Sequence, residues 1–185
     1  MKVDVIWTPE VQQNIFRKLL TAFARPARVL DLVDMLVGAN ALEGILATLV
    51  DNAVNLSDPD GLVDTQTRHL LQTVSCRPEK AAYIVADGGN PPCFTPYTGT
   101  LESPESGATI ILEVTRVGSG SYDNTFIGPG IDGEQPLAVE GLHHQWLENR
   151  NTWNQAFPLG IDMLLVDRHC IAALPRTTKI KLKEV

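Results

Sequence analysis

The sequence predicts an α/β domain in which helices cover a mixed central sheet. Apolar residues recur at three- to four-residue spacing in some segments, as in amphipathic helices, whereas other segments are short apolar runs rich in branched side chains, as in buried strands. The two patterns alternate along a chain of 185 residues, a length that suits one ordinary domain able to bury roughly 70% of its unfolded surface. We therefore expect a single domain over residues 1–185 with a largely antiparallel sheet.

Four segments carry the helical pattern. The first begins at Thr8, which offers a hydroxyl cap, continues with Pro9 at the first helical position, and should end before Pro26. The other three show apolar stripes or helix-breaking residues at their ends. The predicted helices cover residues 9–25, 42–53, 64–76 and 139–153.

The strand pattern is clearest near the end of the chain, where Ile161–Val166 and Cys170–Leu174 flank a short polar turn at residues 167–169. These two runs predict a buried β-hairpin. Residues 108–117 form the longest strand candidate, and residues 122–127 should pair back onto it after a glycine-rich turn. Further short strands are expected at residues 28–33, 81–86 and 178–182, with a loop at residues 87–106.

Charge and composition exclude several classes of function. The formal net charge of -7 argues against a nucleic-acid partner, which needs a basic face. No apolar run approaches the roughly 20 residues of a membrane span, and the N-terminus lacks the apolar region of a signal peptide. The three cysteines are widely spaced, so we expect free thiols and a cytoplasmic location.

Three candidate sites have simpler explanations. His143 and His144 are adjacent on a predicted helix, where neighbouring side chains diverge, so they make a poor metal pair even with Glu148 nearby. Cys93 has no neighbouring base to activate it. The glycine-rich stretch at residues 118–121 lacks the Lys-Ser/Thr of a phosphate loop. We predict neither a metal site nor a catalytic residue from these motifs.

A possible anion-binding or structural site involves the loop at Gly128-Pro129-Gly130. Gly128 and Gly130 allow backbone angles that other residues avoid, and such loops can present amide groups to an anion. The simpler interpretation, which we favour, is a sharp exit from the preceding strand.

Asp162 and Arg176 form the second part of this candidate site. If the hairpin turns about Arg168, Asp162 lies opposite Leu174, and the long side chain of Arg176 can reach it diagonally. We expect a structural ion pair, with anion binding by Arg176 as the alternative. Thr177 and Thr178 either end the strand or join the anion site.

Five motifs carry a family resemblance through their order and spacing. They are FRKLL at residues 16–20 with Arg25-Pro26, LATLVDN at 46–52, PESGAT at 104–109, GPGI at 128–131, and PLGID at 158–162 followed by PRTT at 175–178. Together they resemble the PhnH family, a subunit of the bacterial carbon–phosphorus lyase machinery. Ala27 departs from the pattern, since glycine is expected after the proline, and this makes a left-handed turn there less expected.

The resemblance implies a three-layer α/β/α fold similar to the fold of the pyridoxal-phosphate-dependent transferases, but without the cofactor site. It also implies a homodimer that joins PhnG, PhnI and PhnJ in a core complex, where ATP and a phosphonate are converted into ribose 1-phosphonate 5-triphosphate with loss of adenine. A pyridoxal enzyme needs a buried Schiff-base lysine. The lysines here lie on predicted helix faces, in loops or near the end of the chain, so we expect no cofactor.

Three hypotheses follow. The leading one is a non-catalytic or co-catalytic subunit of a phosphonate-ribosyl-triphosphate synthase, a transferase complex. The main alternative is a stand-alone dimeric binding module for a phosphorylated small molecule. The third is a stand-alone enzyme that uses the regions of Asp162–Arg176 and Gly128–Gly130. The motifs supply no nucleophile with a matching base, which favours the first two hypotheses over the third.

Overall fold

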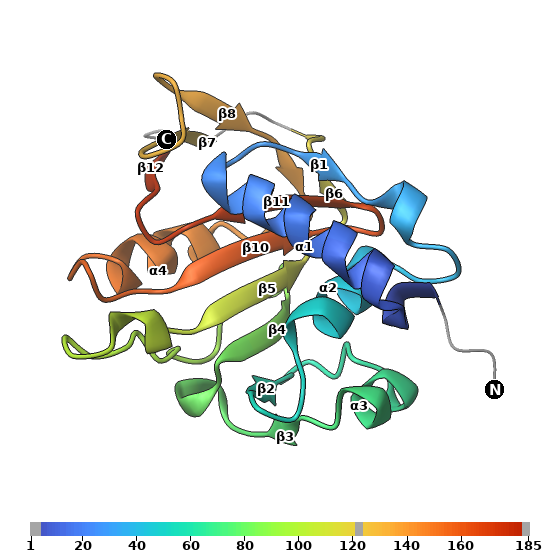
Figure 1. The fold of residues 1–185 in the computed structure, drawn as a ribbon. Coiled ribbons are helices and arrows are strands. Elements are labelled where there is room, and N and C mark those ends of the chain that lie inside the picture. The colour runs from blue at the N-terminus through green and yellow to red at the C-terminus, as the bar shows by residue number, and fades with distance from the viewer. Residues whose placement is uncertain (1–4, 121–123, 183–185) are drawn as a thin grey trace.

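The computed structural model describes residues 5–120 and 124–182, and its centre is a seven-stranded mixed sheet (Figure 1). This confirms the predicted α/β class. In spatial order the strands are β1 (Leu30–Asp31), β11 (Cys170–Leu174), β10 (Asp162–Val166), β5 (Thr109–Glu113), β4 (Tyr83–Asp87), β2 (Asn55–Ser57) and β3 (Val74–Ser75).

The sheet is mostly parallel, so the expected largely antiparallel arrangement is wrong. The neighbours from β10 through β5, β4 and β2 to β3 are all parallel, whereas β1–β11 and β11–β10 are antiparallel. The predicted hairpin is confirmed as β10–β11. Long connections allow chain crossovers between parallel strands, and an apolar run buried on both faces does not reveal its direction.

Four α-helices are present in the described part of the chain, and all are shorter than predicted, the first by only one residue. The helix expected from residue 139 begins later, because Val139–Glu140 forms strand β9 and Gly141 turns the chain with φ +77°. The helix expected to reach residue 76 ends when Gln72 adopts the left-handed region with φ +53°. The helices are α1 (Pro9–Ala24), α2 (Ala41–Leu49), α3 (Thr65–Leu71) and α4 (Gln145–Trp153), with 3-10 turns η1 (Val5–Trp7), η2 (Val33–Met35), η3 (Pro78–Lys80) and η4 (Pro104–Ser106).

The residues that precede α1 and α2 differ in whether their side chains cap the helix. Thr8 precedes α1 as predicted, but its hydroxyl donates a hydrogen bond to the carbonyl oxygen of Val5 at 2.7 Å instead of capping the helix. At α2, the Asn40 side chain accepts from the Glu43 amide at 2.8 Å, and the Glu43 carboxylate accepts from the Asn40 amide at 2.7 Å. This capping box fixes the start of α2.

A second, three-stranded sheet holds β12 (Lys179–Leu182), β7 (Asn124–Ile127) and β8 (Gln135–Leu137). The expected pairing of residues 122–127 with 108–117 is therefore wrong, although Tyr122 and Asp123 lie outside the described residues. Residues 108–117 also divide into β5 and a short β6 (Arg116–Val117), which pairs with β9. The glycines of this region turn the chain toward new partners instead of folding it back onto β5.

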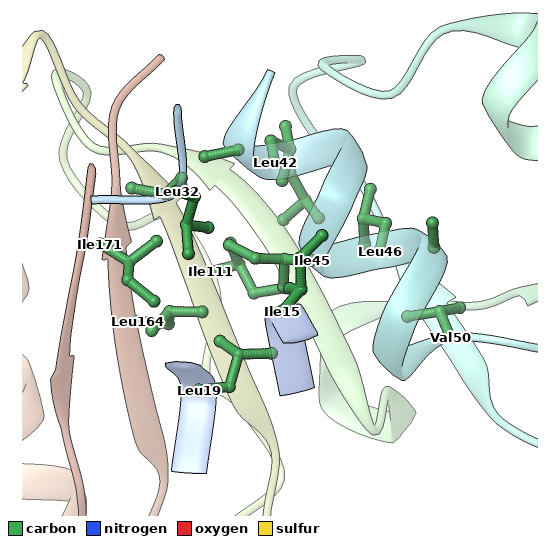
Figure 2. Packing of buried hydrophobic residues seen from close by; sticks show 14 of the residues in the cluster. Ile15, Leu19, Leu32, Leu42, Ile45, Leu46, Val50, Ile111, Leu164 and Ile171 are labelled. Carbon is green, nitrogen blue, oxygen red and sulfur yellow. The ribbon is translucent and has the colours of Figure 1, made fainter. Parts of the chain in front are cut away.

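Apolar side chains cover both faces of the large sheet. On one face α1 and α2 pack against the strands, with Ile15 and Ile45 beside Ile111 (Figure 2). On the other face, Trp146 of α4 and Phe126 of β7 belong to a separate buried cluster. Helices thus flank the sheet from both sides. None of the helices within residues 5–120 and 124–182 has the length and apolar character that crossing a membrane requires.

Ala27 corrects an expectation about backbone conformation. It adopts φ +61° and its amide donates to the carbonyl oxygen of Ala173 at 2.9 Å. The left-handed turn after Pro26 therefore forms with alanine where glycine would be easier. A single such residue costs about 1–2 kcal/mol, which the buried position of Ala27 and its hydrogen bond to β11 help to offset.

Candidate functional site

Asp162 and Arg176 form an ion pair at the amino end of β10. The Nη2 atom of Arg176 lies 2.7 Å from the Asp162 Oδ2 atom, and the Arg176 amide donates to Oδ1 at 2.7 Å. The side chains are only 14% and 22% exposed. The predicted contact is confirmed, but the register is shifted by one residue: Met163, and not Asp162, lies opposite Leu174.

The same arginine joins a third sequence motif to this edge. Its Nη1 atom donates a hydrogen bond to the carbonyl oxygen of Pro104, which begins the PESGAT motif. Gly107 leaves the space for this contact: a Cβ atom there would lie 3.1 Å from Nη1 and 2.2 Å from the carbonyl oxygen of Gly160. The PESGAT motif therefore meets the distant PLGID and PRTT segments where β5 and β10 begin.

Arg150 of α4 is a residue of this edge that sequence reasoning missed. It is fully buried, and its guanidinium donates to the carbonyl oxygens of Thr178 and Leu174 at 3.0 Å each and to that of Pro175. Burial lowers the pKa of Arg150 to about 10, an effect that the negative charge of Asp162 opposes. Its spacing of four residues from Trp146 places it on the inward face of the helix, a periodicity signal that was available.

The turn after β11 brings two more predicted residues together with Gly128. The Thr178 amide donates to the carbonyl oxygen of Pro175 at 2.8 Å, which closes the turn. A Cβ atom on Gly128, where φ is +145°, would lie 3.0 Å from the Thr177 carbonyl oxygen. The hydroxyl of Thr178 is buried and has no hydrogen-bond partner among the described residues.

Gly130 serves a different contact. At φ +84°, a Cβ atom there would lie 2.2 Å from the carbonyl oxygen of Ala24, at the end of α1. Backbone of the GPGI loop therefore packs directly against backbone of the helix end and of the PRTT turn. Both glycines are explained by close packing, which fits the strand-exit interpretation better than an amide nest for an anion.

The weaker sequence candidates are scattered. His143 and His144 stack with ring centroids 4.5 Å apart just before α4, and not within the helix as expected. Cys93 is exposed. Burial raises the pKa of Cys76 and of Cys170, which keeps these thiols protonated at neutral pH. No group of three or more His, Cys, Asp or Glu residues in the described ranges is placed to hold a metal ion.

The carboxyl ends of the parallel strands have a different character. A cavity of about 690 Å³ opens there between the start of α2, the end of β5 and the β10–β11 turn. Glu113, the last residue of β5, lines it together with Arg168 and His169. Burial, and then the negative charges of Asp87, Asp58 and Glu43, raise the pKa of Glu113. Sequence reasoning named none of these three as site residues, because Glu113 ends β5 whereas Arg168 and His169 belong to the distant β10–β11 turn, and no spacing in the sequence relates the two segments.

The two edges differ in what they can do chemically. At the amino edge the charged groups are already joined to each other and to backbone carbonyls, which suits a structural role. At the carboxyl edge charged groups face open space, and ligands of open α/β sheets bind at this end. The fold is therefore that of a mixed-sheet α/β protein. Its sequence motifs hold the framework together at the amino end of the parallel strands, and its charged cavity lies at their carboxyl end.

The comparisons with known proteins agree with the motif pattern. The family model described as "Bacterial phosphonate metabolism protein (PhnH)" matches residues 4–181, and the chain therefore belongs to the PhnH family. A putative C-P lyase subunit protein HtxG from Stutzerimonas stutzeri is 44% identical over 179 residues, covering 96% of this chain and 90% of that protein.

A second relative extends the similarity to another bacterium. The alpha-D-ribose 1-methylphosphonate 5-triphosphate synthase subunit PhnH of Rhizobium meliloti (strain 1021) is 28% identical over 182 residues, covering 91% of this chain and 90% of that protein. Both relatives are named as subunits, the first of a C-P lyase and the second of an alpha-D-ribose 1-methylphosphonate 5-triphosphate synthase.

Proposed function

We propose that this chain is a subunit of the carbon–phosphorus lyase core complex and acts beside PhnG-, PhnI- and PhnJ-type subunits. In that complex ATP and a phosphonate would be converted into ribose 1-phosphonate 5-triphosphate. The family match over residues 4–181 carries the proposal, and the subunit names of both relatives support it. The role of this chain would be non-catalytic or co-catalytic, because its Asp162–Arg176 pair is engaged within the frame.

An apolar surface on α1 supports assembly with other chains. Phe16 and Leu20 lie one helical turn apart and are 45% and 54% exposed. Val33 and Val37, in and beside the neighbouring η2 turn, are also exposed. Exposed apolar groups that gather on adjoining segments suit a protein interface. We propose that this surface binds a second copy of the chain or another subunit.

Co-purification from phosphate-starved cells tests the proposal. The tagged wild-type chain should elute with PhnG-, PhnI- and PhnJ-type subunits, and light scattering of the isolated chain should give a dimer. Phe16→Glu should weaken at least one of these associations. Leu101→Glu is the matched control, since Leu101 is 78% exposed on a distant loop. Elution of the wild-type chain without these subunits would contradict the proposed function, whereas unaffected association of Phe16→Glu would contradict only the proposed surface.

We also propose that the fold is similar to that of the pyridoxal-phosphate-dependent transferases, and that the chain does not bind pyridoxal phosphate. A cytoplasmic location is supported by the three free cysteines, which suit a reducing compartment. We also keep the proposal that residues 1–185 act as a single domain.

A further inference from the structure

The cavity at the carboxyl ends of β5 and β10 is lined by Glu113 and Arg168, two charged groups that form no ion pair within the described residues. It measures about 690 Å³, within the range of roughly 300–1,000 Å³ typical of small-molecule sites. Its walls come from the start of α2, the end of β5 and the turn between β10 and β11. A site built from three elements that the core holds in place is largely preformed.

Glu113 provides an unpaired negative charge in this cavity. The side chain is partly buried and forms no hydrogen bond with any residue that the structure describes. The neighbouring carboxylates are occupied: Asp58 pairs with Arg68, and Asp87 accepts from the Gly89 amide at 2.8 Å. Glu43 accepts from the Asn40 amide. A cation bound at Glu113 would therefore balance the one carboxylate of this group that has no partner among the described residues.

The β10–β11 turn provides the opposite charge. The side chain of Arg168 is exposed and forms no ion pair within residues 5–120 and 124–182. Beside it, the Nδ1 atom of His169 is buried and lacks a hydrogen-bond partner in the described part of the chain. Buried polar atoms without a partner are uncommon, and a shift of the His169 ring toward the cavity would let a ligand oxygen satisfy this nitrogen. Arginine is also well suited to bind an oxyanion.

We infer that this cavity binds a small zwitterion, with its ammonium group at Glu113 and its oxyanion at Arg168 and His169. An oxyanion alone would face the carboxylates around Glu113, and an ammonium alone would leave Arg168 and His169 unused. The choice of a phosphonate as the oxyanion rests on the proposed function, so aminoalkylphosphonates are the expected class. A carboxylate in the same place would satisfy the same charges.

Calorimetric titration of the isolated chain tests the inference without any partner subunit. We expect 2-aminoethylphosphonate to bind, and ethylphosphonate and ethylamine, which each lack one charge, to bind at least about tenfold more weakly. Glu113→Gln and Arg168→Ala should weaken 2-aminoethylphosphonate to a similar degree. Arg116→Ala is the matched control, because Arg116 lines a neighbouring cavity but not this one, and it should leave binding unchanged.

The outcomes separate this inference from the proposed function. No binding of 2-aminoethylphosphonate, or equal binding of ethylamine or ethylphosphonate, would overturn the zwitterion site whatever the co-purification shows. Binding of β-alanine as tight as that of 2-aminoethylphosphonate would support the site with a carboxylate as its oxyanion. The ligand comparisons use the wild-type chain, so the result stands even if a variant fails to fold, which circular dichroism would reveal.

Discussion

The two ends of the parallel strands contain similar residue types but use them in opposite ways. At the amino end, the Arg176 guanidinium binds the Asp162 carboxylate and the Pro104 carbonyl oxygen. At the carboxyl end, Glu113 and Arg168 line the same cavity without an ion pair between them. Charge that is paired and shielded stabilises a frame, whereas charge that faces open space remains available to a ligand.

This difference also explains why the residues of the amino end stand in recognisable sequence motifs. The amino-end residues sit in motifs with glycine and proline, because several backbone segments approach one another closely there. The carboxyl-end residues need no special backbone and therefore leave no local motif. A conspicuous motif can thus indicate packing, and a binding site can lack one.

The largest expected effect is at Gly107, where the amino end is most tightly packed. Gly107→Ala should destabilise the fold by about 3 kcal/mol or more, because the added Cβ atom would lie 2.2 Å from a backbone oxygen that cannot move freely. Gly133→Ala is the control, since nothing lies within 4 Å of the methyl group that it would add and only its φ of +71° is strained. It should cost about 1 kcal/mol in denaturant unfolding. Equal losses would show that the amino end tolerates expansion.

The ion pair should give the next largest effect. Arg176→Ala and Asp162→Ala should each cost about 3 kcal/mol, because each leaves a mostly buried charge without its partner. The double variant should lose clearly less than the sum of the two single losses, and urea unfolding of all three measures this coupling. Additive losses would mean that the two side chains do not interact, and the contrast between the two ends would fail.

Glu113→Gln should change the free energy of unfolding least, and it should raise this free energy where the preceding variants lower it. A carboxyl whose folded pKa is raised makes the protein lose stability as the pH rises from the unfolded pKa to the folded one. The variant should therefore be more stable than wild type at pH 7, by less than about 1 kcal/mol because the partly exposed site is screened. The difference should vanish below the unfolded pKa. Thermal unfolding of both proteins between pH 3 and pH 7 measures this difference in stability, and it should appear above the ordinary glutamate pKa of about 4.3. A variant that is less stable than wild type at pH 7 would show instead that Glu113 stabilises the frame.

Local sequence patterns predicted where the strands lie better than they predicted which strands pair and in which direction. The hairpin of β10 and β11 was predictable because a short polar turn separates two apolar runs. The direction of β4 and β5 was not, because crossover connections depend on packing that a single strand does not encode. The pairing of β7 was also not predictable, because one of its two partners, β12, lies more than fifty residues away in the sequence.

The candidate site was predictable to a similar extent. Asp162 and Arg176 were found because a hairpin register relates them directly, and the one-residue error in that register did not prevent the contact. Arg150 could have been found from its spacing to Trp146, although an arginine is not ordinarily expected in a core. Glu113 and His169 meet only through the tertiary fold, so no spacing in the sequence relates them.

The buried guanidinium of Arg150 has a consequence for how the protein opens. It binds the carbonyl oxygens of residues 174, 175 and 178, which lead from the large sheet into β12, while its own backbone belongs to α4. The helix and the last strand therefore cannot separate without exposing this arginine and three carbonyl groups at once. In native-state hydrogen exchange, the amides of α4 and of the turn before β12 should open together as one cooperative unit.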